Sequence, residues 1–243
     1  MAEFTPFLLL SLAVFAGALV SGFAGFAFSA VAGALLLHVL PPADAVPLMM
    51  ICSIAVQGAS LVILRHNIKW RGSLMFIVGG VVGIPPSLYL LYHVDTWAFR
   101  VGFGIFLAVY SAYMLFRPTV ACLRQVTSRL QGGMVGFAGG LVGGLTAMPG
   151  AMPTIWCDLQ GLPKDQQRGI VQPFIAMMQL SALSLMLLHN GLPTKVLMNF
   201  TLSLPALAAG TAVGIAMFGR VSDVVFRRVV LGALFVAGVA LAV

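Results

Sequence analysis

The sequence predicts an all-α polytopic membrane protein made of two inverted-topology repeats, each with a broken or re-entrant helix segment followed by three transmembrane helices. Three observations lead to this prediction. The composition is too apolar for a soluble domain, long apolar runs alternate with short basic segments, and the second half of the chain repeats features of the first. We therefore expect residues 1–243 to form a single transmembrane domain.

The composition places the chain in a membrane. Hydrophobic residues make up 60% of the 243 residues and charged residues only 8%, and the mean hydropathy is +1.06. A soluble domain could not expose so apolar a surface. The formal net charge is +7, but most Lys and Arg stand between apolar runs, where they set membrane orientation. We expect a lipid bilayer as partner, no nucleic acid, and a multi-pass location in a bacterial plasma (inner) membrane.

The start of the chain and its cysteines carry no further signal. Residues 1–4 lack a positively charged segment, so we expect the first apolar run to be retained rather than cleaved as a signal peptide. Cys52, Cys122 and Cys157 are isolated and form neither a metal-ligand pattern nor a disulfide set. We expect free thiols, no metal site and no cofactor.

The apolar runs give the elements in chain order. The first run, 4–40, is too long for one crossing of about 20 residues and short for two, and residues 21–25 interrupt it. The run 130–162 is also long, and we expect it to break at Pro149 and Pro153, because proline removes a helical N–H and clashes with the preceding turn. Six other runs each fit one crossing: 46–64, 73–92, 97–116, 169–188, 196–218 and 224–243.

A break at membrane depth leaves backbone N–H and C=O groups without helical partners. Such a segment is tolerated only where it is buried in protein or lines a cavity. The glycine-rich stretch 139–154 and its weaker echo at 16–25 are therefore the first places to expect a ligand.

An internal repeat emerges when the chain is compared with itself at an offset of 122 residues. It predicts repeats at about 1–118 and 124–243, joined by the basic linker 117–129. After a short insertion in the second half, the offset grows by a few residues. The matched pairs include Gly22 with Gly144, Gln57 with Gln179, Gly83 with Gly210, and Arg100 with Arg227.

The basic segments discriminate between a parallel and an inverted repeat. If each long broken run crosses once, the basic segment 220–228 lies outside, against the positive-inside rule. If each long run instead returns to the side from which it started, as two short crossings or a re-entrant hairpin, the basic segments all lie inside. These segments are 65–71, 117–129, 164–168 and 220–228. The halves then have opposite orientations, and both chain ends face the non-cytoplasmic side.

Residues 136–153 (GFAGGLVGGLTAMPGAMP), supported by 20–25 (VSGFAG), resemble the sulfite exporter TauE/SafE family, also called the toluene-sulfonate uptake permeases. The resemblance spans essentially the whole chain. The family often has a glycine triplet before its proline; here 147–150 (AMPG) is similar to a variant branch that has Thr-Gly-x-Pro-Gly. The resemblance implies a permease for a small sulfur-containing anion such as sulfite, a sulfonate, sulfoacetate or thiosulfate.

Such an anion is a compact set of oxygen acceptors, so its site needs converging N–H and O–H donors. The start of a helix supplies unpaired N–H groups and a partial positive charge. We expect 21–25 and 146–153 to present two such starts, with hydroxyl donors from Ser21 and Thr146. The alternative is that the glycines only let helices pack closely. The candidate substrate-binding residues of the two turns are Ser21, Gly22, Gly25, Gly144, Thr146 and Gly150.

Three glutamines in apolar runs are further candidates for substrate binding. Gln57 and Gln179 are repeat-equivalent, and Gln172 precedes Gln179 by seven residues, on roughly the same helical face. A buried amide costs free energy unless it is paired, so each is expected to face protein or a cavity. They could donate N–H bonds to an anion, or simply link helices.

Four residues could contact substrate, gate or couple transport. Trp156 and Asp158 follow the second turn, where Trp156 could contact the substrate and Asp158 could carry a proton; an interfacial tryptophan and a water-facing carboxylate are the alternatives. Arg100 and Arg227 could attract an anion or snorkel to the headgroups. Four histidines near segment ends could carry protons or be merely solvated: His38, His66, His93 and His189.

The leading hypothesis is a secondary transporter for a small anionic substrate that works by alternating access. An anion channel on the same half-helix starts, or a permease for another small organic acid, remains the alternative. An intramembrane enzyme would need a nucleophile with its base or a metal cluster, and the sequence has no His-x-x-x-His or Gly-x-Ser-x-Gly pattern. No catalytic residue is assigned. The direction of transport, the coupling ion and the oligomeric state, including a homodimer, are open.

Overall fold

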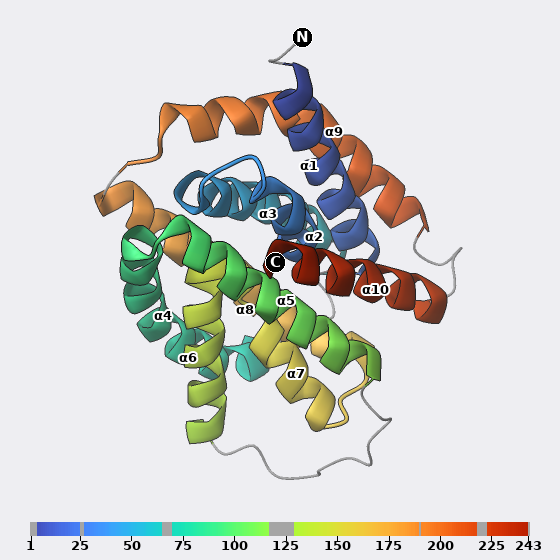
Figure 1. Cartoon of the computed structure of the whole chain (residues 1–243). Helices are drawn as coiled ribbons and strands as arrows, with labels where there is room; N and C mark the ends of the chain where they lie inside the picture. The colour runs from blue at the N-terminus through green and yellow to red at the C-terminus, as the bar shows by residue number, and fades with distance from the viewer. Residues whose placement is uncertain are drawn as a thin grey trace. The chain divides into compact units, whose positions relative to one another are not determined.

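The computed structural model describes residues 4–24, 27–64, 70–116, 129–189, 191–217 and 223–242, and every regular element among them is an α-helix. The all-α prediction is confirmed. The helices are α1 (Phe4–Ala24), α2 (Phe28–Leu36), α3 (Pro42–Leu64), α4 (Trp70–His93), α5 (Thr96–Phe116), α6 (Arg129–Thr146), α7 (Ala151–Leu159), α8 (Lys164–His189), α9 (Thr194–Met217) and α10 (Asp223–Ala242) (Figure 1).

Each of the six runs predicted to cross once is a helix, namely α3, α4, α5, α8, α9 and α10. Among the described residues, four helices are long and apolar enough to span a membrane: α4, α5, residues 166–189 of α8, and α9. Shorter apolar helical stretches cover Phe7–Phe23, Pro42–Gly58 and Val230–Ala242. The helices therefore fit a multi-pass membrane protein.

The chain divides into two compact units, which do not coincide with the two predicted repeats. Unit 1 comprises Met1–Val56, Val94–Arg117 and Leu192–Val243. Unit 2 comprises Gln57–His93 and Pro118–Gly191. Each unit thus combines helices from both halves of the sequence.

In unit 2, α4 packs along α6 and α8. A Cβ at Gly79 would overlap the carbonyl of Gly133, and one at Gly83 would overlap the carbonyl of Phe137. Residue numbers rise together along this contact, so α4 and α6 run parallel. The Ser73 hydroxyl donates to a carbonyl of α8, that of residue 170, over 2.6 Å. Close backbone approach through small residues is the usual way in which helices associate in lipid.

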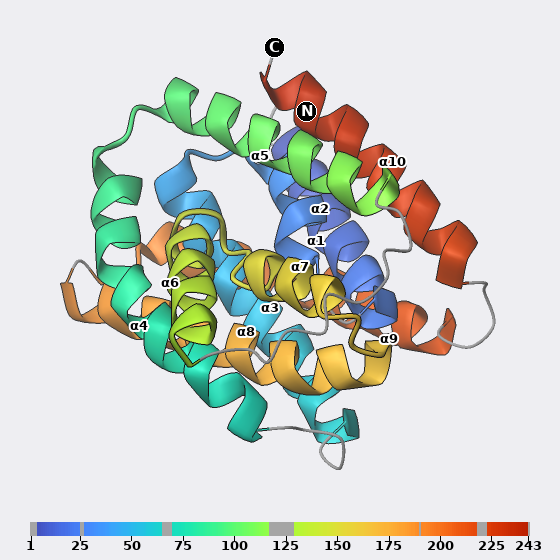
Figure 2. The ribbon, with the colours of Figure 1, turned by 90° about the horizontal axis from the view of Figure 1, so that it is seen from below.

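In unit 1, α1 packs along α9 (Figure 1) and α5 along α10 (Figure 2). A Cβ at Gly210 would lie 2.5 Å from the Phe15 carbonyl oxygen, and one at Gly214 would overlap the carbonyl of Leu19, so α1 and α9 run parallel. Gly104 approaches Ala242, whereas Gly238 approaches residue 108. Since residue numbers rise on one helix as they fall on the other, α5 and α10 are antiparallel.

The contacts of α4 with α6 and of α9 with α1 match each other. Gly83 faces the carbonyl of Phe137, and Gly210 faces the carbonyl of Phe15. Phe15 and Phe137 are 122 positions apart, which is the offset of the sequence repeat, and Gly83 and Gly210 are a matched pair of that repeat. The two helix contacts are therefore alike in the residues that make them, and the division of the chain into two repeats stays a prediction.

The predicted break at Pro149 is confirmed, but the glycines before it lie elsewhere than expected. The helix α6 ends at Thr146 and α7 begins at Ala151, so the break comprises residues 147–150. Residues 139–144 are helical and belong to α6. Glycine weakens a helix only modestly, and here it permits the close contact with α4, so these residues need not leave the helix.

The first break also lies later than expected. The helix α1 continues through Ser21 to Ala24, and Ala27 has a left-handed backbone with φ of 79° before α2 begins. Residues 21–24 contain no proline, so nothing removes a helical N–H there. Ser21 is therefore in the last turn of α1 rather than at a helix start, and Gly25 lies outside the described residues.

Candidate functional site

The break between α6 and α7 is a buried helical hairpin within unit 2. Ala147 has a φ of 55°, which turns the chain out of the helix, and residues 147–150 are all buried. The short helix α7 then folds back on α6, since Gly139 lies against Pro149 and Pro153. The sequence folds this way because a left-handed residue and a following proline cannot continue α6.

A predicted site residue lies directly on this break. The Gln179 side chain is 1% exposed, and its Nε2 donates a hydrogen bond of 3.2 Å to the carbonyl oxygen of Ala147. The last carbonyls of a helix have no intrahelical partner, so a side-chain donor from α8 stabilises this end of α6. The structure thus brings together the glutamine and the break that the sequence singled out separately.

The other two glutamines are buried as well, as predicted. Gln172 lies two turns before Gln179 on α8 and is 3% exposed. Gln57 on α3 is 2% exposed, and its Oε1 has no hydrogen-bond partner among the described residues. Contact of any of the three with substrate stays a prediction.

The remaining candidates at the second turn have structural contacts of their own. The Thr146 hydroxyl donates to the Val142 carbonyl over 2.7 Å, so its proton is engaged within α6. A Cβ at Gly144 would overlap the Ser87 side chain of α4, and one at Gly150 would lie 2.6 Å from the side chain of residue 175. Close packing, the alternative given above, accounts for both glycines in this structure, and their contact with substrate stays a prediction.

The first turn belongs to unit 1. Ser21 is 1% exposed, and Gly22 packs on α9, where a Cβ would lie 2.9 Å from the carbonyl of Thr211. Ser29, which the sequence analysis missed, is the second residue of α2 and is 2% exposed. Its hydroxyl has no hydrogen-bond partner among the described residues. A serine in an apolar run directly after a break is the sequence signal that could have found it.

The four gating or coupling candidates lie at different places. Asp158 accepts a 2.7 Å hydrogen bond from Gln167, which links the end of α7 to the start of α8. Trp156 and Arg100 are half-buried, and the Trp156 Nε1 and Arg100 Nε atoms lack hydrogen-bond partners among the described residues. Arg227 belongs to α10, but its side chain lies outside the described part of the chain.

Where the structure describes side chains, no group of three or more His, Cys, Asp or Glu is placed to hold a metal ion.

A family model described as Sulfite exporter TauE/SafE matches residues 9–241 of the chain and so includes both helix breaks and the three glutamines. Comparisons with curated proteins and with solved structures give no match.

Proposed function

Because the chain belongs to the sulfite exporter TauE/SafE family, we propose that it is a secondary transporter that moves a small sulfur-containing anion by alternating access. The anion would be sulfite, a sulfonate, sulfoacetate or thiosulfate. The family is a membrane transporter family, and the long apolar helices agree with a multi-pass integral membrane protein. The substrate, the direction and the mechanism of movement belong to the proposal.

The buried break with Gln179 on it carries this proposal. Irregular backbone at membrane depth persists only where protein or a cavity supplies partners, and broken helices mark the substrate sites of several transporter folds. The start of α7 offers N–H groups and the positive end of a helix dipole, both suited to an oxyanion. Gln179 donates a hydrogen bond to the Ala147 carbonyl oxygen. Because this acceptor is already paired, it does not compete with the anion for the N–H groups of α7.

We also propose that the two halves have inverted topology, with both chain ends on the non-cytoplasmic side. The antiparallel contact of α5 and α10 supports this, because equivalent helices of a parallel repeat would point the same way. The parallel pairs α1 with α9 and α4 with α6 agree with the same topology. The 3.9 Å ion pair of Lys195 with Asp44 also agrees with it, because this topology has α3 and α9 start on the same side of the membrane.

The short helices favour re-entrant hairpins over two further crossings. Both α2 and α7 have nine residues, which at 1.5 Å per residue reach only about 13 Å. The hydrocarbon core is about 30 Å thick. Each would therefore enter the membrane with the preceding helix and return to the side from which that helix came.

The proposal is tested by uptake into proteoliposomes of radiolabelled sulfite, thiosulfate, sulfoacetate and taurine, with and without a pH gradient. Saturable uptake of at least one anion, absent from protein-free liposomes, is the expected result. No movement of any of the four under either condition would contradict it and would direct attention to other organic acids. Single-channel currents in planar bilayers would instead favour the anion channel.

A further inference from the structure

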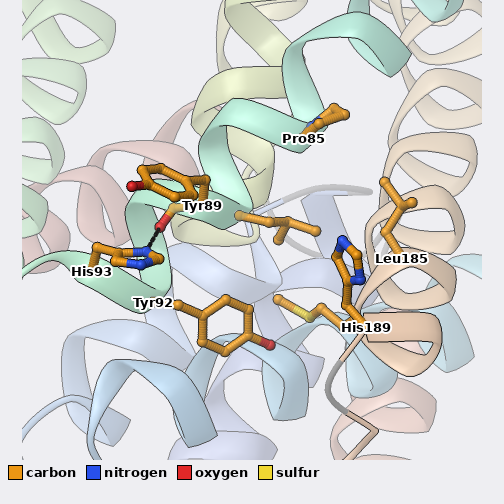
Figure 3. Close-up of a pocket in the computed structure, with 8 residues that line it drawn as sticks. Pro85, Tyr89, Tyr92, His93, Leu185 and His189 are labelled. Carbon is orange, nitrogen blue, oxygen red and sulfur yellow. Dashed lines mark hydrogen bonds between the residues drawn. The ribbon is translucent and has the colours of Figure 1, made fainter.

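A cavity of about 530 Å³ lies in unit 2 between the C-terminal ends of α4 and α8 (Figure 3). It starts about 10 Å past the break, since Met186 follows Gln179 by seven residues on the same helix face. None of its lining residues is among the candidate substrate-binding residues named above. The lining includes Leu88, Tyr89, Tyr92 and His93 of α4, and Met186 and His189 of α8.

The cavity is too large for a bare sulfite and is of the size of pockets that hold organic ligands. Its lining combines apolar side chains such as Leu88 and Met186 with four polar aromatic groups. No carboxylate lines it among the described residues. An anion with an apolar body matches this composition, whereas a cation would find no counter-charge.

The imidazole of His93 is fixed in place. Its Nδ1 lies 2.7 Å from the Tyr89 carbonyl oxygen, and its ring stacks on that of Tyr89 with centroids 4.1 Å apart. A carbonyl only accepts hydrogen bonds, so Nδ1 carries the proton and Nε2 is left as an acceptor. His93 can therefore donate to an anion only when Nε2 is protonated as well, so that the anion and a proton bind together.

His189 is placed differently. It is the last residue of α8, and in the view of Figure 3 its ring lies on the opposite side of the cavity from His93. An imidazole always carries at least one N–H group, so the His189 ring can donate a hydrogen bond to an anion. The other titratable groups of the lining are the Tyr89 and Tyr92 phenols.

We propose that this histidine cavity is a second binding site, which takes an organic anion with an apolar body, such as an alkyl sulfonate, on His189 and protonated His93. It rests on the proposed function, in which the ends of α4 and α8 face the non-cytoplasmic side and the bound anion lies on the path to the break.

The test measures binding of ethanesulfonate, butanesulfonate and hexanesulfonate to the full chain in lipid nanodiscs by titration calorimetry. We expect affinity to rise up to about fourfold for each methylene that is buried and to be higher at pH 6 than at pH 8. Hexanol, which has no charge, is expected to bind more weakly and without pH dependence. Equal binding of hexanol and hexanesulfonate would overturn the proposal, because the cavity would then be only an apolar niche for lipid.

Variants locate the site. His93→Gln and His189→Gln are each expected to lower affinity and to weaken the pH dependence, because each variant removes one imidazole that can take up a proton beside the anion. Leu185→Trp fills the cavity and is expected to weaken hexanesulfonate binding at least tenfold, while Leu188→Trp, at a position 82% exposed on the same helix, leaves it unchanged. Unchanged binding in Leu185→Trp would place the ligand elsewhere.

Sulfite uptake by the same proteins separates the two proposals. Sulfite uptake without alkyl sulfonate binding overturns the histidine cavity and leaves the transporter in place. Alkyl sulfonate binding to a protein that moves none of the four test anions contradicts the proposed function but supports the cavity.

Discussion

At the scale of single residues, Gln179 is the side chain that ties α8 to the break. Gln179→Ala removes the donor to the Ala147 carbonyl and leaves a buried acceptor unpaired, which costs about 1–3 kcal/mol. We expect uptake at low substrate concentration to fall about tenfold or more, since 1.4 kcal/mol corresponds to a factor of ten. Ser184→Ala, an exposed position on the same helix, is the control. If the Gln179→Ala protein takes up substrate as fast as the wild type at equal amounts of folded protein, the break is not part of the substrate site.

Substitution of Ser29 is expected to affect protein stability and substrate affinity differently. Its buried hydroxyl has no protein partner among the described residues, so Ser29→Ala should leave Tm unchanged or raise it. If the hydroxyl serves the substrate, the KM for uptake rises several-fold. Ser111→Ala removes another buried hydroxyl without a partner in the described part of the chain, on α5, and should change neither quantity. The same KM in both variants would exclude Ser29 from substrate binding.

At the scale of helices, glycines hold the parallel pairs together. Gly83→Ala and Gly210→Ala would drive a Cβ into the carbonyls of Phe137 and Phe15, so both should lower Tm by several degrees. Gly102→Ala is the control, because a Cβ there meets nothing and alanine gains about 1 kcal/mol of helix propensity. Thermal unfolding in detergent provides the comparison. A Gly210→Ala protein as stable as Gly102→Ala would show that α1 and α9 do not pack as described.

The sequence predicted the helices well and their breaks less well. Apolar runs of about 20 residues locate crossings reliably, because a bilayer demands them. Proline was an ambiguous signal: Pro149 ends a helix, whereas Pro173 and Pro205 lie inside α8 and α9, where neighbouring groups in a membrane protein can satisfy the freed carbonyls. The sequence identified Gln179 as a candidate, but its contact with Ala147 joins residues 32 positions apart and needs the folded packing.

At the scale of the whole molecule, topology is the feature most open to test. In a chain whose own cysteines are replaced by alanine, Arg124→Cys and Arg220→Cys should react with impermeant thiol reagents only from the cytoplasmic side. A cysteine added after Val243 should react only from the other side. Labelling of the Arg220→Cys protein from outside would contradict the inverted repeat.

The measurement that tests the central claim most directly is counterflow in proteoliposomes loaded with unlabelled substrate, the substrate being the anion identified in the uptake assay. An alternating-access carrier exchanges internal substrate for a trace of labelled substrate outside, so we predict a transient accumulation of label above equilibrium by the wild type. The Gln179→Ala protein should show a strongly reduced peak. Simple equilibration of label without overshoot in the wild type would contradict a carrier and indicate a channel.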